Sequence, residues 1–194
     1  MRNLRGLTVE EVGVLDRERN RFFGRSGDFI FEARQPRKKD STDHRKVWKK
    51  LSPYTKERYR RLYEDPSIYD PKWRCRLPLY RGAIPGFIPL IMVVDDKIVG
   101  VADMMFKYGT DYKLHNIADD EVGCSMNLCV LDSLQGMGYG SFYGHISVFI
   151  AKHFRADWAL GNTPYKKGMY HTRMRTGWEH IGRYRDNALI RLKL

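Results

Sequence analysis

The stretch from residue 128 to residue 140 constrains the fold most, because it combines a strand, a glycine loop and the start of a helix. Met126, Leu128 and Val130 are apolar at every second position, which predicts a strand with one buried face. The strand pattern ends at Asp132 and Ser133. Glycines then occupy every second position of the next stretch, at Gly136, Gly138 and Gly140.

A helix is predicted directly after the glycines, because apolar residues recur there at helical spacing. These residues are Tyr139, Phe142, Tyr143, Ile146, Phe149, Ile150 and Phe154. A glycine loop that leads into a helix favours phosphate binding, since backbone N–H groups approach the anion closely and the helix start carries a partial positive charge. Two common nucleotide loops do not fit. A Walker loop needs a lysine before Ser141, and a dinucleotide-binding loop needs a different glycine spacing.

The loop resembles the acyl-CoA pyrophosphate loop of the GNAT superfamily of N-acetyltransferases. The superfamily pattern is Leu-x-Val-x-Pro-x-x-Gln/Arg-Gly-x-Gly-x-Gly. The residues that fall on it without a gap are Leu128, Val130, Gln135, Gly136, Gly138 and Gly140. Asp132 stands where the pattern has proline. The order of predicted strands and helices also resembles the superfamily along nearly the whole chain, although the N-terminal third matches only loosely.

This resemblance implies an α/β fold with a mixed, mostly antiparallel central sheet flanked by helices, in a single domain over residues 1–194. Residues 121–182 would form the acyl-CoA-binding core, and the donor would be acetyl-CoA or another acyl-CoA. A backbone N–H at or beside Val130 would bind the thioester carbonyl, and the N–H groups of the loop would hold the pyrophosphate. The implied cofactor-binding residues are Leu128, Val130, Gln135, Gly136, Met137, Gly138, Tyr139, Gly140, Ser141 and Asn162.

The general acid of the superfamily is usually a tyrosine four residues before a glycine–aromatic pair. Here the pair is Gly177–Trp178, and Arg173 occupies the tyrosine position. Tyr170 lies one helical turn earlier on the same face, and Tyr165 is a further candidate. Either Tyr170 acts as the acid, or Arg173 has another role and the reaction is not plain acetylation. Ordinary packing is the alternative interpretation of Tyr170.

A general base is less well defined by the sequence. Ser125 lies on the strand before the loop, and Asp132 lies at the loop entrance, where it equally fits a helix-capping role. Other polar candidates in this part of the chain are Asp103, His115, Glu121 and Asn127. Many members of the superfamily remove the amine proton through water, so a dedicated carboxylate is not required.

Composition narrows the class of protein. At 194 residues, 42% of them hydrophobic, the chain can bury a sizeable core. Since no apolar run approaches the ~18 residues of a membrane span and the N-terminus lacks a signal-peptide core, we expect a cytoplasmic protein without a membrane partner. The cysteines Cys75, Cys124 and Cys129 form no CxxC pair, which predicts neither a disulfide framework nor a metal site.

A net charge of +12 indicates a polyanionic partner, with solubility alone as the alternative. Part of the excess charge could also serve the polyphosphate of CoA. Basic and aromatic residues concentrate in residues 34–86, the expected acceptor side. They predict phosphate contacts and base stacking, with a solvated helix face over a few core aromatics as the alternative. The candidate nucleic-acid-binding residues are Lys38, Lys39, Arg45, Lys46, Trp48, Lys49, Arg58, Arg61, Trp73, Arg76, Tyr80 and Arg81.

An amine on nucleic acid is therefore the first expectation for the acceptor, on a DNA base or, second, on an aminoacyl-tRNA. The phage Mom-type proteins, GNAT-like modifiers of adenine in DNA, are a comparison within this class. An enzyme that reaches a base in a duplex must flip it, and aromatic side chains support a flipped base. The alternatives are a protein or small-molecule amine as acceptor and, in another class, a non-catalytic nucleic-acid- or acyl-CoA-binding module. Monomer and dimer both remain open.

The remaining elements follow from local patterns. Thr8–Glu11 forms a capping box, which predicts a helix with Val12, Leu15 and Phe22 inward that ends near residues 24–27. Residues 4–7 predict a short strand, and residues 29–31 fit either a strand or a contact between helices. Prolines make residues 65–86 irregular. Further predicted elements are a hairpin over 89–106 with its turn at residues 95–96, strands over 121–131, 158–162, 179–184 and 188–193, and a helix over 167–176.

Overall fold

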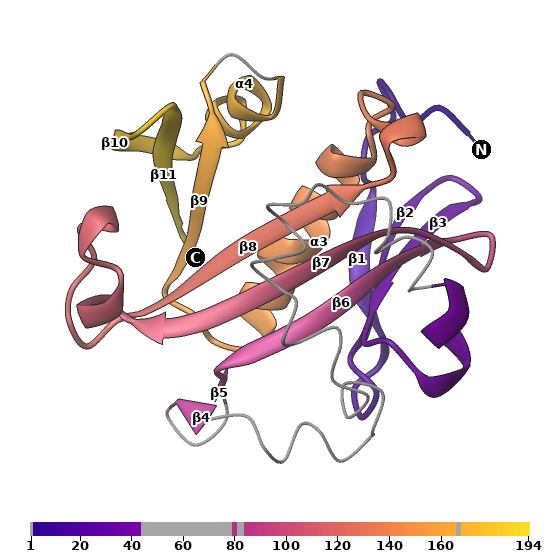
Figure 1. The fold of residues 1–194 in the computed structure, drawn as a ribbon, viewed down its shortest axis with the longest axis horizontal. Helices are drawn as coiled ribbons and strands as arrows, with labels where there is room; N and C mark the ends of the chain where they lie inside the picture. Colours follow the sequence, from indigo (N-terminus) through magenta and orange to yellow (C-terminus); the bar gives the residue numbers. More distant parts are fainter. Residues whose placement is uncertain (1, 44–78, 81–83, 166–167) are drawn as a thin grey trace. The chain divides into compact units, whose positions relative to one another are not determined.

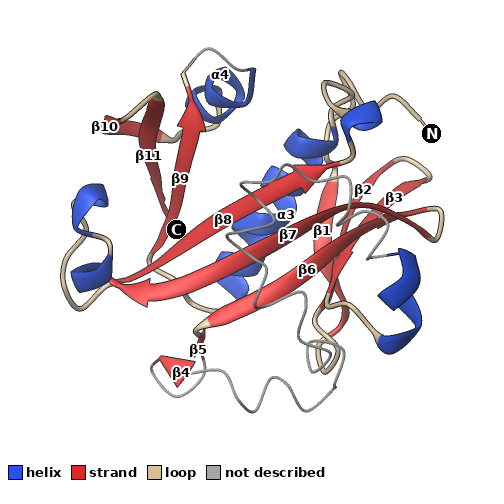
Figure 2. Ribbon diagram, viewed as in Figure 1, coloured by secondary structure: helices blue, strands red, loops and turns tan. Residues whose placement is uncertain are grey.

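The computed structural model describes residues 2–43, 79–80, 84–165 and 168–194 (Figure 1). Its strands are β1 (Glu11–Asp16), β2 (Arg21–Ser26), β3 (Phe29–Arg34), β4 (Leu79–Tyr80), β5 (Ile84–Pro85), β6 (Phe87–Val94), β7 (Lys97–Tyr108), β8 (Val122–Val130), β9 (Trp158–Pro164), β10 (Glu179–Tyr184) and β11 (Asn187–Lys193). The labelled α-helices are α3 (Tyr139–His153) and α4 (Gly168–Arg175), and Figure 2 draws them in blue together with short 3-10 turns. Within the described residues, no helix is long and apolar enough to span a membrane.

Nine strands form one sheet in the order β1-β2-β3-β6-β7-β8-β9-β11-β10, and β4 pairs with β5 separately. The pairs β1–β2, β2–β3, β3–β6, β9–β11 and β10–β11 are antiparallel. β8 and β9 are parallel, as expected for two strands joined by a crossover helix, here α3. The predicted α/β class with a mixed, mostly antiparallel sheet is confirmed.

The chain divides into two compact units. The first contains the described parts of Met1–Leu77, Ile88–Asp103 and Leu128–Ile146, and the second contains those of Pro78–Phe87, Met104–Asn127 and Ser147–Leu194. The glycine loop belongs to the first unit, whereas β9 and α4 belong to the second.

The first unit buries aromatic side chains between β3 and the start of α3. The ring of Phe142 lies edge-on to Phe29 at 5.6 Å and 6.2 Å from Phe31, and Tyr139 also lies 6.2 Å from Phe31. Phe31, Tyr139 and Phe142 are fully buried or nearly so. The apolar face predicted for the helix is therefore the face that anchors the end of the glycine loop.

The predicted N-terminal helix is wrong, because residues 11–26 form the β1–β2 hairpin instead. Gly13 disfavours helix, and its missing side chain leaves room for the ring of Phe23, which a Cβ would approach to 2.7 Å. Asn20 adopts a left-handed φ of 46°, and the Arg19 N–H donates to Asp16 Oδ1 at 3.0 Å, so the turn is locally stabilised. Pairing with β2 thus overrides the helical spacing.

Two neighbouring predictions are decided as well. Residues 4–7 are not a strand, since a turn places the Leu7 N–H 3.2 Å from the Leu4 carbonyl and Gly6 has a φ of 79°. The undecided residues 29–31 belong to β3, which pairs with β2 over its whole length.

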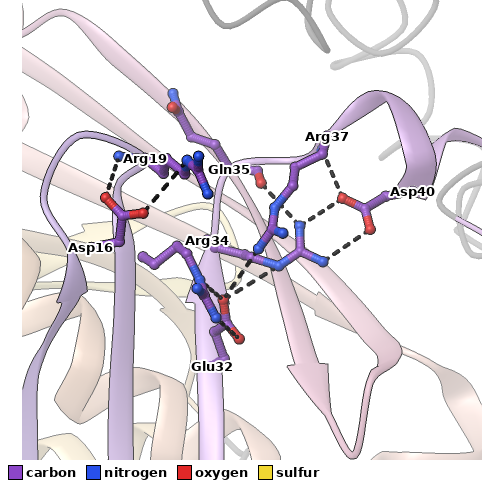
Figure 3. Close-up of polar contacts among 8 residues, drawn as sticks. Asp16, Arg19, Glu32, Arg34, Gln35, Arg37 and Asp40 are labelled. Atoms are coloured by element: carbon purple, nitrogen blue, oxygen red, sulfur yellow. Dashed lines mark hydrogen bonds and ion pairs between the residues drawn. The ribbon is translucent and has the colours of Figure 1, made fainter.

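A buried ion network fixes the chain where β3 ends (Figure 3). Arg34 donates to the two carboxylate oxygens of Asp40 at 2.6 and 2.9 Å, and its Nε lies 3.3 Å from Glu32. The Arg37 backbone N–H also donates to Asp40, at 2.7 Å. Burial alone raises the pKa of Asp40, but these hydrogen bonds outweigh it and hold the pKa below its ordinary value.

The second unit is held together around Trp158 and Glu121. Glu121 accepts hydrogen bonds from Trp158 Nε1 at 2.6 Å and from Lys193 Nζ at 2.5 Å. The side chains of Lys193 and Arg191 also lie over the indole ring, at 4.5 and 4.6 Å from its centre. The connection after β7 is therefore tied to the start of β9 and the end of β11.

The predicted elements after residue 87 are confirmed with small shifts in their ends. The hairpin turn at Asp95 and Asp96 has a positive φ at both residues, 48° and 58°. The helix predicted over residues 167–176 is α4, and Gly177 ends it with a φ of 84°. The strands predicted over 158–162, 179–184 and 188–193 are β9, β10 and β11.

Candidate active site

The glycine loop joins β8 to α3 in the first unit. After β8, a single 3-10 turn spans Asp132–Leu134, and Gly136 and Gly138 then adopt positive φ angles of 75° and 92°. These are left-handed conformations that favour glycine. The motif found in the sequence therefore has the strand–loop–helix geometry predicted for it.

Four backbone N–H groups of this loop lack an acceptor. In the described part of the chain, the N–H groups of Gly136, Gly138, Tyr139 and Gly140 have no hydrogen-bond partner, whereas those of Gln135, Met137 and Ser141 donate to carbonyls within the loop. Gly136 is exposed, and Gly138 and Gly140 are half-buried. Unpartnered N–H groups at the start of a 15-residue helix are suited to an anion.

Gly138 has a second reason to be glycine. A Cβ at this position would lie 2.6 Å from the carbonyl carbon of Leu4 and 2.9 Å from the backbone N of Arg5. The Leu4 N–H donates to the Met137 carbonyl at 2.7 Å, and the Tyr139 hydroxyl donates to the Arg2 carbonyl at 3.0 Å. The N-terminal segment Arg2–Leu7 therefore lies directly against the loop, a contact that the sequence does not reveal.

Asp132, the residue in place of the expected proline, has a structural contact. Its Oδ1 accepts a hydrogen bond from Gln135 Nε2 at 2.8 Å, and its carbonyl accepts one from the Gln135 N–H at 3.1 Å. Both side chains are exposed. Asp132 and Gln135 therefore stabilise the turn before the glycines through their side chains. The helix-capping role is not observed, because among the described residues Asp132 makes no side-chain cap hydrogen bond and α3 begins only at Tyr139.

Leu128 and Val130 lie near the end of β8, where β7 approaches closely. A Cβ on Gly100 of β7 would lie 2.5 Å from the Cys129 carbonyl oxygen and 3.1 Å from Cα of Val130. The Leu131 N–H donates to the Val99 carbonyl at 3.1 Å. Gly100 thus sets the position of the strand end from which the loop begins.

In the second unit, the parallel ladder between β8 and β9 is short. It joins Gly123–Ser125 to Trp158–Leu160, whereas β11 pairs with all seven residues of β9. Among the described residues, Gly161–Pro164 therefore have a strand neighbour on one side. Asn162 lies in this half of β9 and is exposed. An unpaired strand edge is a place where an extended ligand can bind.

The candidate acids Tyr165 and Tyr170 lie together in the second unit. Their ring centres are 5.1 Å apart, and the ring of His180 is edge-on to both, at 5.0 Å from Tyr165 and 6.0 Å from Tyr170. The Tyr165 hydroxyl hydrogen-bonds to His180 Nε2. In the described residues the Tyr170 hydroxyl has no hydrogen-bond partner. His180 was not a candidate from the sequence, because only the β9–β11–β10 pairing brings it to Tyr165.

The Arg173 side chain is packed against Trp178 and Gly161. Its guanidinium lies 4.2 Å from the centre of the Trp178 ring, and its Nη1 lies 3.0 Å from the position of a Cβ on Gly161. The Trp178 N–H also donates to the Arg173 carbonyl at 3.2 Å. These contacts anchor the end of α4 and give Arg173 a place in the packing of the second unit.

The candidate bases in this unit are engaged in other contacts. The Ser125 hydroxyl lies 3.0 Å from the Tyr112 hydroxyl, which donates to the Met105 carbonyl at 2.8 Å. The hydrogen bond from Lys193, with one from Trp158, lowers the pKa of Glu121 to about 2. Such a carboxylate is too weakly basic to take a proton from an amine near neutral pH. Burial lowers the pKa of His115, whose Nε2 lies 3.4 Å from the Gly161 carbonyl.

The predicted nucleic-acid residues are only partly described. Lys38 and Lys39 are exposed on the 3-10 turn Lys38–Asp40, whose position the Arg34–Asp40 pair fixes. The backbone of Tyr80 belongs to β4. The residues that lie outside the described part are Arg45, Lys46, Trp48, Lys49, Arg58, Arg61, Trp73, Arg76 and Arg81. In the described part, no group of His, Cys, Asp and Glu side chains could hold a metal ion.

Comparison with known proteins rests on structure. No protein-family model matches the sequence, and no curated protein matches it either. A GNAT-family acetyltransferase from Listeria monocytogenes is similar with a TM-score of 0.55 and 11% identity, over 89% of this chain and 99% of that one. The PaiA N-acetyltransferase of Thermoplasma acidophilum, solved with coenzyme A, has a TM-score of 0.54 and 10% identity, over 84% and 99%. Mycobacterium smegmatis RimJ, solved with CoA-disulfide, has a TM-score of 0.54 and 13% identity, over 84% and 82%.

The chain has the GNAT fold. At these identities the comparisons establish the fold alone, because proteins of one fold can have different activities.

Proposed function

We propose that this protein is an N-acyltransferase that takes an acyl group from acyl-CoA and gives it to an amine. The observation that carries the proposal is the glycine loop, whose unpartnered N–H groups at Gly136, Gly138, Tyr139 and Gly140 lie at the start of α3. Two proteins of the same fold bind CoA or its disulfide. The loop fits the diphosphate of CoA, since several N–H donors and the helix start meet one anion.

Acyl transfer from CoA also needs a site for an extended ligand and an acid that protonates the leaving thiolate. When bound, an acyl-CoA supplies an activated thioester, from which an amine takes the acyl group and leaves a thiolate. Within the second unit, the unpaired edge of β9 at Gly161–Pro164, with Asn162, is a place where an extended ligand can bind. Tyr170, whose hydroxyl is free in the described structure, suits the role of the acid that protonates the thiolate.

For the acceptor, we propose an amine on nucleic acid, with DNA ahead of tRNA. The support is the +12 charge and the basic, aromatic composition of residues 34–86, in which Lys38 and Lys39 are exposed. A modified DNA base, as in the phage Mom-type proteins, is one form of this acceptor. Protein and small-molecule amines are the alternative outcome of the test below.

The first experiment is a matched pair of variants at Gly136. Its φ of 75° is tolerated by Asp and Asn, and the contact of an added Cβ is with the flexible end of the Arg5 side chain. Gly136→Asp and Gly136→Asn have nearly the same shape and differ by one negative charge. We expect Gly136→Asp to lose CoA binding and Gly136→Asn to retain most of it, measured by calorimetry. Equal affinities in both variants and the wild type would contradict an anion site at the loop.

The second experiment identifies the acceptor. Nucleosides digested from the DNA and tRNA of cells that express the wild type or Gly136→Asp are compared by mass spectrometry. A new nucleoside present only with the wild type supports a nucleic-acid acceptor, and its added mass identifies the acyl group. Unchanged nucleosides, together with acylation of spermidine or lysine peptides by the purified protein, would overturn the nucleic-acid proposal and retain the transferase.

A further inference from the structure

A single arginine from the N-terminal segment lies on the glycine loop. The Nε of Arg5 donates to the Gly136 carbonyl, and its Nη2 lies 3.0 Å from the position that a Cβ on Gly136 would take. The two residues are 131 positions apart in the chain. The placement is supported by the backbone, since Leu4 and Met137 are hydrogen-bonded at 2.7 Å.

Arg5 retains donors for a ligand. Its side chain is exposed, and within the described residues it has no acidic partner and no hydrogen bond besides the one from Nε. A guanidinium carries five N–H donors in a planar fork, so the donors on both Nη atoms remain available. They lie beside the loop that holds the unpartnered N–H groups of Gly136, Gly138 and Tyr139.

We propose that Arg5 binds the diphosphate of CoA together with the N–H groups of the loop. This inference rests on the proposed function and adds a charged residue that the loop motif does not contain. An exposed cation beside several unpartnered N–H groups matches a diphosphate, because a fork of N–H donors can reach two phosphate oxygens at once. A Cβ at position 136 would lie 3.0 Å from Arg5 Nη2, which shows how close the guanidinium lies to the loop backbone.

The matched control for Arg5 is Arg2 from the same segment. Its guanidinium carbon lies 5.6 Å from the centre of the Phe29 ring, and its backbone carbonyl accepts a hydrogen bond from the Tyr139 hydroxyl at the start of α3. Arg2→Ala therefore removes the same charge from the same segment without removing a side chain from the loop. Arg5→Lys keeps the charge but loses the planar fork.

The test measures the affinity of each protein for CoA, 3′-dephospho-CoA and pantetheine by calorimetry. We expect Arg5→Ala to weaken CoA and 3′-dephospho-CoA by about 10- to 100-fold, since both contain the diphosphate. Pantetheine, which has no phosphate, should bind Arg5→Ala and wild type within about twofold. Arg2→Ala should bind all three ligands like the wild type, and Arg5→Lys should restore part of the lost CoA affinity.

Three outcomes would overturn the inference. CoA affinity that is unchanged in Arg5→Ala removes Arg5 from the site, and an equal loss for pantetheine shows that Arg5 only holds the N-terminal segment in place. A loss confined to CoA, absent with 3′-dephospho-CoA, assigns Arg5 to the 3′-phosphate instead. If the wild-type protein does not bind CoA at all, the proposed function fails rather than the assignment of Arg5 alone.

Discussion

The ion pair between Arg34 and Asp40 offers a sharp test of how the first unit is stabilised. Only 7% of the Arg34 side chain and 9% of the Asp40 side chain are exposed. Asp40→Ala would remove the acceptor of three N–H groups, two from Arg34 and one from Arg37. Arg34 would then keep Glu32 at 3.3 Å as its acidic neighbour among the described residues.

The expected loss of stability is large for a single substitution. Removal of one partner of a buried ion pair typically costs 3–5 kcal/mol, and the remaining Glu32 contact places this case at the lower end, about 3 kcal/mol. For a protein of this length that corresponds to a fall in Tm of roughly 6–12 °C. The free energy of unfolding is measured by urea titration at pH 7, with tryptophan fluorescence and far-UV circular dichroism as two probes.

Two further variants make the result interpretable. Glu11→Gln breaks the Glu11–Arg25 pair, whose side chains are 53% and 47% exposed, and should cost at most about 1 kcal/mol. Asp40→Asn removes only the charge. Because the pKa of Asp40 lies below its ordinary value of 3.8, the charge stabilises the fold above that pH and less as the pH falls further. Loss of less than about 1 kcal/mol in Asp40→Ala would refute the reasoning.

Other expectations follow from the loop and from the second unit. Gly138→Ala should destabilise the protein by about 2 kcal/mol or more in urea titration, since its φ is 92° and the added Cβ meets the Leu4 backbone. Gly144→Ala in α3 should instead stabilise the protein by up to about 1 kcal/mol, because the added Cβ meets nothing within 4 Å. Glu121 contributes stability that is complete above pH 4.5 and is lost as the pH falls toward 2, so Glu121→Gln should flatten the acid limb of stability over that range. Tyr170→Phe should lower kcat of acyl transfer about 100-fold with KM little changed, and a loss as large in the Tyr165→Phe control would move the acid to Tyr165.

The sequence predicted the second half of the fold well, because each element there is marked locally. The β6–β7 turn has two adjacent Asp residues, α4 ends at Gly177, and the residues of α3 recur at helical spacing. The N-terminal hairpin was missed because the capping box Thr8–Glu11 and the spacing of Val12 and Leu15 fit a helix equally well. Pairing with β2 decided the outcome, and such pairing is not visible in a local pattern.

Some residues of the candidate site were likewise predictable from the sequence, and others were not. The glycine loop was predictable because its residues are contiguous and its proposed role depends on backbone N–H groups rather than on side chains. Arg5 and His180 were not, since each contact depends on tertiary structure: Gly136 is 131 positions from Arg5, and Tyr165, on the connection after β9, is 15 positions from His180 in β10. Arg173 could be located but its packing over Trp178 could not be foreseen, because a cation over a ring depends on rotamers.

The short ladder between β8 and β9 has a consequence for hydrogen–deuterium exchange. In a strand with one neighbour, alternate N–H groups point to that neighbour and the others to solvent. From Gly161 to Thr163, amides that point toward β11 should exchange slowly while those between them exchange fast, in contrast to uniform protection at Ala159 and Leu160. A ligand that lies along this edge as an extra strand would abolish the alternation, so the exchange pattern alone could report its binding before any turnover is detected.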